Sequence, residues 1–272
     1  MPYPLEKTPL ALTDKSALVF LARIGAPVVY VVREMGNMGV FMGRTLATAS
    51  VPPFKFGLLM KRVQFFGFQS LVIILLTGLF TGMVLGYQGY YTLAQVGSTA
   101  LLGPMVALAL LRELGPVIGA LMVTARAGSA VTAEIGIMRI NEEIDALELM
   151  GLSPFRYLVA PVLLAAVVCM PLLTAVFNAI GIVGGYVVGV RFLGIGAGTY
   201  FGEMMDYVDM EDIAAMLYKS LAFGALIAWV SCWKGSRAGY GAEGVSRATT
   251  QSVVLSSVLI LVFDYFLTSI LF

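Results

Sequence analysis

The chain has 272 residues, of which 59% are hydrophobic and only 12% are charged, and its mean hydropathy is +0.91. A soluble domain carries about 25% charged residues, so this composition excludes an ordinary soluble protein and indicates an integral membrane protein. The net charge of +1 gives no indication of a nucleic-acid partner, and the lack of any His excludes histidine catalysis and most transition-metal sites. Because the apolar runs are long and do not alternate as strands do, we expect an all-α protein rather than a barrel.

The first 62 residues are predicted to form a cytoplasmic N-terminal segment. From residue 14 to residue 48 the sequence is apolar but is interrupted by Arg23, Glu34 and Arg44, which are close to three helical turns apart and share one helix face. The apolar runs between these charges are too short to cross a bilayer. We therefore expect an amphipathic helix lying in the membrane interface, with a sixth spanning helix as the alternative.

Residues 63–272 are predicted to form a transmembrane domain of five helices. The spans are expected over residues 65–85, 99–125, 157–190, 213–233 and 248–272. Gly86–Tyr91 supplies turn signals and interfacial aromatic residues between the first two spans. The second span contains Gly115-Pro116, which predicts a kink, and a Gly-rich loop is expected over Lys234–Arg247.

Small side chains and thiols indicate how the spans pack. Four glycines between residues 181 and 189 have a spacing that allows a second helix to approach closely. Cys169 and Cys232 lie in separate apolar segments, so free buried thiols are expected rather than a disulfide.

The densest polar stretch between two spans is Arg126–Arg156. Asn141 has the chemistry of an N-cap, and acidic residues follow it in the first turn. Apolar residues recur at helical spacing from Ile137 to Met150, and Gly151 is suited to end a helix. We therefore expect a short amphipathic helix over about residues 137–151, serving either as a solvated loop helix or as a docking helix for a soluble partner.

The distribution of basic residues predicts the orientation in the membrane. Fourteen of the 17 Lys and Arg residues lie before residue 63, within residues 126–156 or within residues 234–247. These regions share one side of a five-span arrangement, and the excess of positive charge identifies that side as cytoplasmic. The N-terminus is then cytoplasmic and the C-terminus periplasmic. The opposite side carries an acidic cluster of Glu203, Asp206, Asp209, Glu211 and Asp212.

Four charged residues lie inside predicted spans, namely Arg112, Glu113, Lys219 and Asp264. A charge at the bilayer centre costs at least about 2.5–3.5 kcal/mol, so such residues are expected to face protein or water and to pair. We predict the pairs Glu113–Lys219 and Arg112–Asp264, because Arg112 and Glu113 are adjacent and point in different directions on a helix. The four residues either line a polar cavity open toward the periplasm or form ion pairs that lock helices together, and the two roles are compatible.

Four separated motifs resemble the MlaE-type permeases and occur in that family's order. They are LRELGPV (Leu111–Val117), ARAGSAVTAEIG (Ala125–Gly136), ELMGLSP (Glu148–Pro154) and GVSRATT (Gly244–Thr250). The resemblance runs from about Phe65 to the C-terminus. These permeases are the membrane subunits of ABC transporters that move phospholipid between the two membranes of Gram-negative bacteria.

The resemblance implies a multi-pass permease subunit of the bacterial inner membrane that maintains the lipid asymmetry of the outer membrane. It implies that the short polar helix is a cytoplasmic coupling helix between spans two and three. The coupling residues would be Glu134, Arg139, Glu142, Glu143, Asp145 and Glu148. The intramembrane charges Arg112, Glu113, Lys219 and Asp264 would line a lipid cavity at a permease dimer interface.

The partners that the resemblance implies are a second copy of the chain, a cytoplasmic ABC ATPase, a small cytoplasmic accessory subunit and a periplasmic lipid-binding MCE-type ring protein, with bound phospholipid as substrate and no nucleic acid. The sequence has no phosphate-binding loop, so the chain is not expected to be an enzyme, and ATP-Mg belongs to the partner ATPase. An ion-coupled secondary transporter and a non-transporting scaffold are the alternatives. The lack of an internal repeat weighs against the first of these.

Overall fold

The computed structural model describes residue 29 and residues 32–48 and 56–271, which are helical apart from short connections and contain no strand. The chain divides into two compact units, Met1–Arg44 and Thr45–Phe272. In the N-terminal part, residues 32–48 form a helix within the range predicted for the amphipathic helix. Arg23, one of the three charges on which that prediction rests, lies outside the described residues.

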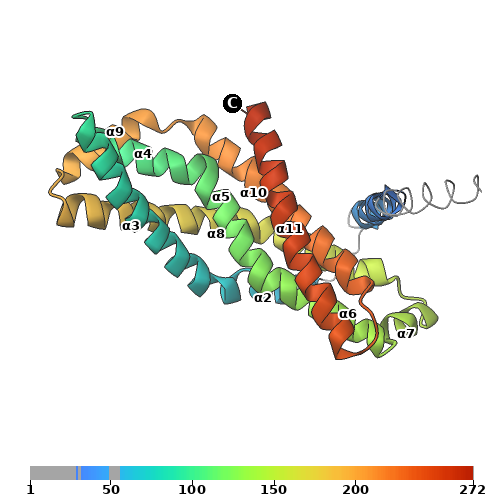
Figure 1. Cartoon of the computed structure of the whole chain (residues 1–272). Helices are drawn as coiled ribbons and strands as arrows, with labels where there is room; N and C mark the ends of the chain where they lie inside the picture. Colours follow the sequence, from blue (N-terminus) through green and yellow to red (C-terminus); the bar gives the residue numbers. More distant parts are fainter. Residues whose placement is uncertain (1–28, 30–31, 49–55, 272) are drawn as a thin grey trace, which may run out of the picture. The chain divides into compact units, whose positions relative to one another are not determined.

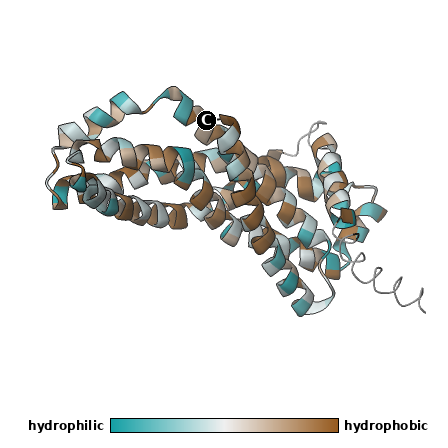
Figure 2. Cartoon of the chain, turned by 45° about the horizontal axis from the view of Figure 1, so that its top comes forward, coloured by the Kyte–Doolittle hydropathy of each residue, from teal (hydrophilic) through white to brown (hydrophobic). Residues whose placement is uncertain are grey.

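Five helices within the described residues are long and apolar enough to cross a membrane, as predicted. They cover Phe56–Gln95, Thr99–Ile140, Phe155–Phe192, Met210–Ser236 and Gly241–Leu271. Hydrophobic residues line most of their length, and hydrophilic residues gather toward the two ends of the bundle (Figure 2). The protein is therefore an all-α integral membrane protein.

Several of these spans consist of more than one element. The first contains α2 (Phe56–Phe66), a 3₁₀ turn (Phe68–Ser70) and α3 (Leu71–Gln95). The second begins with a 3₁₀ turn (Thr99–Leu101) and contains the helices α4 (Leu102–Ala109), α5 (Gly115–Val123) and α6 (Ser129–Ile140). A π-helical turn at Leu110–Leu114 separates α4 from α5, and another at Thr124–Gly128 separates α5 from α6. The third contains α8 (Ala160–Tyr186) between π-helical turns at Phe155–Val159 and Val187–Phe192. The other elements are α7 (Glu143–Leu149), α9 (Ala197–Tyr207), α10 (Met210–Ser236) and α11 (Gly241–Leu271).

The second span changes direction between α4 and α5, where a kink was predicted (Figure 1). The ring of Pro116 removes one backbone donor. Immediately before it, the Gly115 N–H donates to the carbonyl of Leu110, five residues back, and this longer bond closes the π-helical turn. Proline and π-helical turns are both recognised causes of helix bending.

The predicted turn at Gly86–Tyr91 is wrong, because α3 continues as a helix to Gln95. The two glycines of this stretch, Gly86 and Gly89, allow neighbouring helices to pack closely instead of reversing the chain. A Cβ atom on Gly86 would lie 3.0 Å from the backbone of Gly185 in α8. The helix ends in a short connection in which Gly97 has a φ of +71°, a conformation that suits glycine.

Close packing between α3 and α8 agrees with the prediction made for the glycines of the third span. A Cβ atom on Gly82 would collide with the carbonyl oxygen of Gly181, and one on Gly184 would collide with the carbonyl oxygen of Leu79. The two backbones therefore approach to a distance that only glycine permits.

The helix predicted over residues 137–151 is two separate helices. Asn141 is the C-cap of α6 rather than the N-cap of a new helix, because its N–H donates to the carbonyl of Ile137. Glu142 then has a φ of +58°, so the chain leaves the first helix there and starts α7 in a new direction. The predicted continuous apolar stripe from Ile137 to Met150 is therefore broken, and α7 spans only Glu143–Leu149.

The helix α7 is terminated by Gly151, as predicted. Gly151 has a φ of +73°, and its N–H donates to the carbonyl of Glu148. The N–H of Leu152 donates to the carbonyl of Leu147, which completes a Schellman-type termination.

The predicted loop over Lys234–Arg247 is mostly helical. The helix α10 continues to Ser236 and α11 begins at Gly241, so only residues 237–240 connect them. A Cβ atom on Gly244 would collide with the backbone of Gly239, which shows that these glycines allow a tight connection rather than a long loop.

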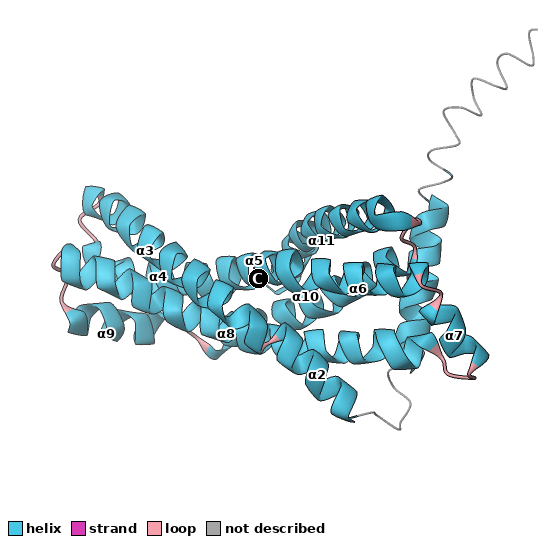
Figure 3. Cartoon of the chain, turned by 90° about the horizontal axis from the view of Figure 1, so that it is seen from below, coloured by secondary structure: helices cyan, strands magenta, loops and turns pink. Residues whose placement is uncertain are grey.

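A helix in the acidic stretch, α9, was not predicted. It packs against α4 through Tyr200, whose side chain is fully buried and whose hydroxyl donates to the carbonyl of Ile182 at 3.2 Å. Burial raises the pKa of Tyr200, so the phenol remains a hydrogen-bond donor. The helices α9 and α7 lie at opposite ends of the bundle (Figure 3).

Candidate functional site

The central feature of the bundle is the buried ammonium group of Lys219, on α10. Its side chain has an exposed fraction of 0%. The Nζ atom lies 2.9 Å from Glu113 Oε2, in the second span, and 2.9 Å from Asp264 Oδ1, on α11. The predicted Glu113–Lys219 pair is therefore confirmed, and Asp264 shares the same ammonium group.

Lys219 also donates to two neutral acceptors. Its Nζ atom lies 2.7 Å from the Arg112 carbonyl oxygen and 2.7 Å from Thr268 Oγ1. The Arg112 carbonyl is four residues before Pro116, which has no N–H with which to complete that helical hydrogen bond. Lys219 supplies the missing donor, so one residue stabilises both the bend in the second span and the charge cluster.

Arg112 does not pair with Asp264, and that prediction is wrong. The Arg112 Nε atom instead lies 2.6 Å from Asp212 Oδ1. Asp212 is the third residue of α10, and its Oδ2 atom accepts the Asp209 N–H at 3.1 Å in a capping box. The carboxylate is therefore fixed by the start of α10, where Arg112 can reach it, while Asp264 is held by Lys219.

Asp212 and Thr268 belong to this cluster but were not assigned to it from sequence. Asp212 was grouped with the acidic surface residues, although its spacing of three from Asp209 is typical of a capping box. Thr268 is four residues after Asp264 and therefore on the same helix face. Its hydroxyl lies 3.0 Å from Glu113 Oε1.

The members of the charge cluster, Arg112, Glu113, Asp212, Lys219, Asp264 and Thr268, differ in exposure. The side chains of Arg112 and Glu113 are 41% and 40% exposed. Asp264 is 16% exposed, and Asp212 only 1%. Charged groups within membrane spans face protein or water rather than lipid tails. Arg112 and Glu113 are thus the most accessible charged members of the cluster.

Two of the residues predicted for coupling lie against other spans. The carboxylate of Glu134 accepts two hydrogen bonds from Arg62 of α2, at 2.6 and 2.7 Å. Arg139 donates to the carbonyl of Ser236 at the end of α10. These contacts join α6 to its neighbours.

The other predicted coupling residues lie at the surface. Glu142, Glu143, Asp145 and Glu148 are exposed on or beside α7. Leu147 is buried and anchors this short helix, whereas Leu149 and Met150 are 90% and 66% exposed. This end of the bundle therefore presents carboxylates next to exposed apolar side chains.

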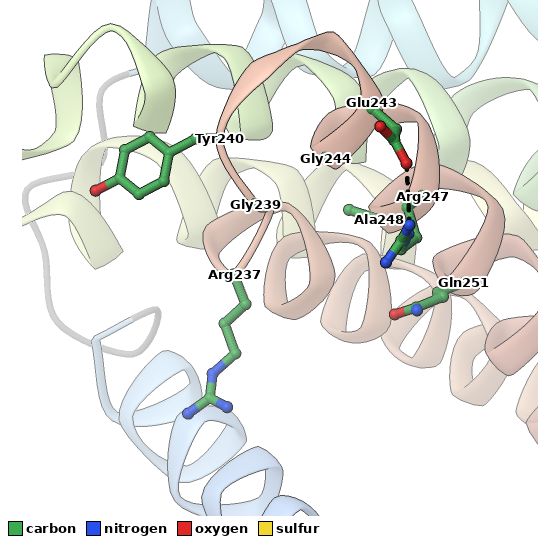
Figure 4. Close-up of a pocket in the computed structure, with 8 residues that line it drawn as sticks. All are labelled: Arg237, Gly239, Tyr240, Glu243, Gly244, Arg247, Ala248 and Gln251. Carbon is green, nitrogen blue, oxygen red and sulfur yellow. Dashed lines mark hydrogen bonds and ion pairs between the residues drawn. The ribbon is translucent and has the colours of Figure 1, made fainter.

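An open pocket of about 350 Å³ lies beside the α10–α11 connection (Figure 4). Gly244, Arg247 and Ala248 of the GVSRATT motif line it, and Arg247 pairs there with Glu243 at 3.0 Å. Arg237 also lines it, and its guanidinium carbon lies 4.1 Å from the ring centroid of Trp233. The pocket does not include any residue of the charge cluster.

The described residues contain no group of three or more Cys, Asp or Glu side chains arranged to hold a metal ion. Both cysteines are buried free thiols, as expected.

Five apolar spans with a cluster of charged side chains among them define a multi-span membrane protein, and charges placed in this way often mark the substrate path of a transport protein. The chain belongs to the MlaE permease family, because the family model described as Permease MlaE matches residues 59–270.

Relatives of this chain come from bacteria and from a plant. The intermembrane phospholipid transport system permease protein MlaE of Haemophilus influenzae is 41% identical over 254 residues, which cover 93% of this chain and 97% of that protein. A probable ABC transporter permease protein of Rickettsia bellii is 38% identical over 249 residues, covering 92% and 96% of the two chains. The chloroplastic protein TRIGALACTOSYLDIACYLGLYCEROL 1 of Arabidopsis thaliana is 33% identical over 213 residues, covering 78% of this chain and 61% of that protein.

Proposed function

We propose that this chain is the permease subunit of an ABC transporter that moves phospholipids between the inner and outer membranes of a Gram-negative envelope and so maintains outer-membrane lipid asymmetry. The observation that carries the proposal is the charge cluster, with two half-exposed members inside apolar spans of an MlaE-family chain. A phospholipid headgroup is charged and needs polar partners to leave the membrane surface. Arg112 and Glu113 supply such partners.

The chain works as a homodimer in this proposal, with the Arg112–Glu113 faces of two copies enclosing the lipid cavity. Two intramembrane charges that are about 40% exposed on one copy require a polar or protein environment. A second copy provides that environment and leaves room for a headgroup between the two faces. Lys219 and Asp264 lie behind these faces, where the buried Lys219 ammonium group pairs with both Glu113 and Asp264.

Energy comes from a separate cytoplasmic ATPase that docks on α7. The exposed carboxylates Glu142, Glu143, Asp145 and Glu148 fit a basic partner surface, and exposed Leu149 and Met150 fit an apolar groove. Because Glu134 and Arg139 tie α6 to α2 and α10, a force on α7 passes directly to three spans. ATP-Mg binds to the ATPase in this arrangement.

The remaining assignments follow the charge distribution and the family. The protein lies in the inner membrane with its N-terminus cytoplasmic and its C-terminus periplasmic. The α7 end then meets the ATPase and a small accessory subunit. The α9 end meets a periplasmic lipid-binding MCE-type ring protein.

Reconstitution with the partner ATPase tests the function directly. In proteoliposomes that contain a labelled phospholipid, we expect lipid movement that requires ATP and ceases when the ATPase is omitted. Movement driven by an ion gradient without ATP would support the secondary-transporter alternative instead. That alternative is not favoured, because relatives at 36–38% identity are named as probable ABC transporter permease proteins.

A further inference from the structure

The pocket beside the α10–α11 connection is basic. Arg237 lines it from the connection itself, and Arg247 and Gln251 line it from α11 (Figure 4). Among the described residues that line it, Glu243 is the one carboxylate. Lys234 reaches its edge, where the Nζ atom lies 3.4 Å from Gln251 Oε1. Three cations therefore surround one carboxylate at this pocket.

The pocket lies where two spans leave the apolar part of the membrane. The apolar run of α10 ends directly before Lys234, and an uncharged run of α11 begins directly after Arg247 and continues to Asp264. Trp and Tyr are enriched at the level of the lipid headgroups, and Trp233 and Tyr240 lie beside the same basic residues. Only 11% of the apolar window of α11 is buried, so this side of the pocket is open to the bilayer.

Both arginines are placed to bind an anion. The Arg237 guanidinium carbon lies 4.1 Å from the ring centroid of Trp233, and this stacking orients the group. Arg247 donates one N–H to Glu243 at 3.0 Å, in an exposed pair of the kind that contributes little to stability. A guanidinium group has five N–H donors, so Arg247 keeps donors for the oxygens of a phosphate.

We infer that this pocket binds the phosphate of an anionic phospholipid, which on the predicted topology belongs to the cytoplasmic leaflet. Basic pockets between membrane helices on the cytoplasmic side are suited to such headgroups. A zwitterionic lipid fits less well, because its amine cation would lie among Arg237, Arg247 and Lys234.

The lipid bound here is a partner of the permease and not its cargo. Trp233 is 14 residues after Lys219 on the same helix, which places the pocket roughly 21 Å along α10 from the charge cluster. The inference goes beyond the proposed function and holds whether or not the chain transports lipid.

A soluble protein is a poorer occupant than a lipid. A partner that binds the exposed carboxylates of α7, at the same end of the bundle, needs a basic surface. Arg237 and Arg247 would repel that surface, whereas they attract the anionic headgroups that lie beside them in the membrane.

The test places the full chain in phosphatidylcholine nanodiscs and reads which lipid lies at the pocket. The chain has two Trp residues, so Trp229→Phe leaves Trp233 as the one Trp fluorophore. A nitroxide near the glycerol end of an acyl chain quenches this fluorescence when the lipid lies beside the pocket. Phosphatidylglycerol and phosphatidylcholine carrying the same nitroxide are compared at the same low fraction of lipid. We expect phosphatidylglycerol to be enriched at Trp233 roughly tenfold or more.

Substitutions in the same Trp229→Phe background identify the groups that bind the phosphate. Arg237→Gln and Arg247→Gln should each lower the enrichment roughly fivefold, the effect of one basic residue near an anionic headgroup. Glu243→Gln should raise it, because the change removes a like charge and releases Arg247, and a misfolded protein cannot produce such a gain. Arg156→Gln is the control, at an exposed position outside the pocket, and should leave the enrichment unchanged.

These results test the inference separately from transport, because neither ATP nor the ATPase is present. Equal quenching by the two lipids, or unchanged enrichment in the Arg237→Gln, Arg247→Gln double variant, would overturn it. Inorganic phosphate at constant ionic strength should not displace the lipid, and displacement would identify a site for a free anion instead. Loss of ATPase co-purification in the double variant, without lipid enrichment in the parent chain, would identify a protein contact instead.

Discussion

At Lys219, on α10, one ammonium group holds two carboxylates and a carbonyl that come from two other spans. Its attraction to Glu113 and Asp264 and its hydrogen bond to the Arg112 carbonyl act on the second span, α10 and α11 at once. In the interior of a membrane protein neither water nor a flexible surface loop replaces such a donor. The fold therefore depends on this side chain independently of any role in transport.

Replacing Lys219 with Met tests that dependence. The Lys219→Met change keeps the length and apolar stem but leaves two carboxylates without their cation. That loss costs roughly 3–5 kcal/mol for a fully buried pair, and less here because Glu113 is 40% exposed and partly screened by solvent. We expect a large fall in the unfolding midpoint of the detergent-solubilised protein.

Lys234→Met is the matched control, because Lys234 lies on the same helix, is only partly buried, and contacts Gln251 at a long 3.4 Å. Its effect should stay within about 0.5 kcal/mol, as for most surface changes. Equal losses of stability in the two variants would show that the buried contacts of Lys219 are not special.

Among the helices, α3 and α8 depend on glycine contacts in which one backbone touches the other. The Gly82 position is the tightest of those described here, because an added Cβ atom would overlap the Gly181 carbonyl. Backbone atoms cannot move aside as a flexible side chain can. The two helices must separate if this position gains a methyl group.

Gly82→Ala and Gly202→Ala should therefore have opposite effects on stability. At Gly82 the overpacking should destabilise the protein by roughly 1–3 kcal/mol. At Gly202, in α9, a Cβ atom meets nothing within 4 Å, so the better helix propensity of Ala should stabilise by up to about 1 kcal/mol. Thermal unfolding of the two proteins measures both, and a stabilising Gly82→Ala change would refute the close approach.

The short helix α7 is the element on which coupling to an ATPase is predicted to depend. Changing both Glu142 and Glu143 to Lys should release the ATPase, because like charges would then face its basic surface. The permease should remain folded, since both side chains are exposed. The same reversal at Glu203 and Asp206, on α9 at the opposite end of the bundle, should leave ATPase co-purification unchanged. Retained binding in the α7 variant would make these carboxylates a solvated face only.

The sequence predicted the number of spans because uncharged runs of bilayer length are unambiguous. It did not predict their ends, since helices such as α10 continue past the apolar run into polar residues. Glycine was the most ambiguous signal. Gly86 and Gly89 have the composition of a turn, yet they lie inside α3, because a glycine that permits close packing looks identical in sequence to one that permits a turn.

The candidate site was predictable in part for a similar reason. Four of its charges stand out because they interrupt apolar runs, and opposite signs correctly suggested the Glu113–Lys219 pair. Asp212 did not stand out, because it lies at the start of a span among other acidic residues. Its partner Arg112 is 100 residues away in sequence, and only the packing of α10 against the second span brings them together.

Across the whole molecule, α7 and α9 mark the two ends of the bundle, and cysteine labelling can assign each end to a side of the membrane. In intact cells, whose inner membrane stays sealed, an impermeant thiol reagent that reaches the periplasm should modify Asp206→Cys on α9. It should modify Tyr240→Cys, at an 85% exposed position of the α10–α11 connection, only after the inner membrane is permeabilised. Both native cysteines are buried, so background labelling should be low. The reverse pattern would invert the predicted topology and remove α7 from the cytoplasm.

The π-helical turn at Leu110–Leu114 has a consequence for how this chain tolerates changes in length. Each residue in an α-helix turns the chain by about 100°. A π-helical turn holds one residue more than the α-helical turn it replaces. Deleting one residue from Leu110–Leu114 would let the turn close as a regular α-helix, so α4 and α5 would keep nearly the same rotation relative to each other. The same deletion inside the regular helix α8 would rotate the residues before it by about 100° relative to those after it and would turn some of its glycines away from α3. A one-residue deletion should therefore be tolerated better at the π-helical turn than within α8.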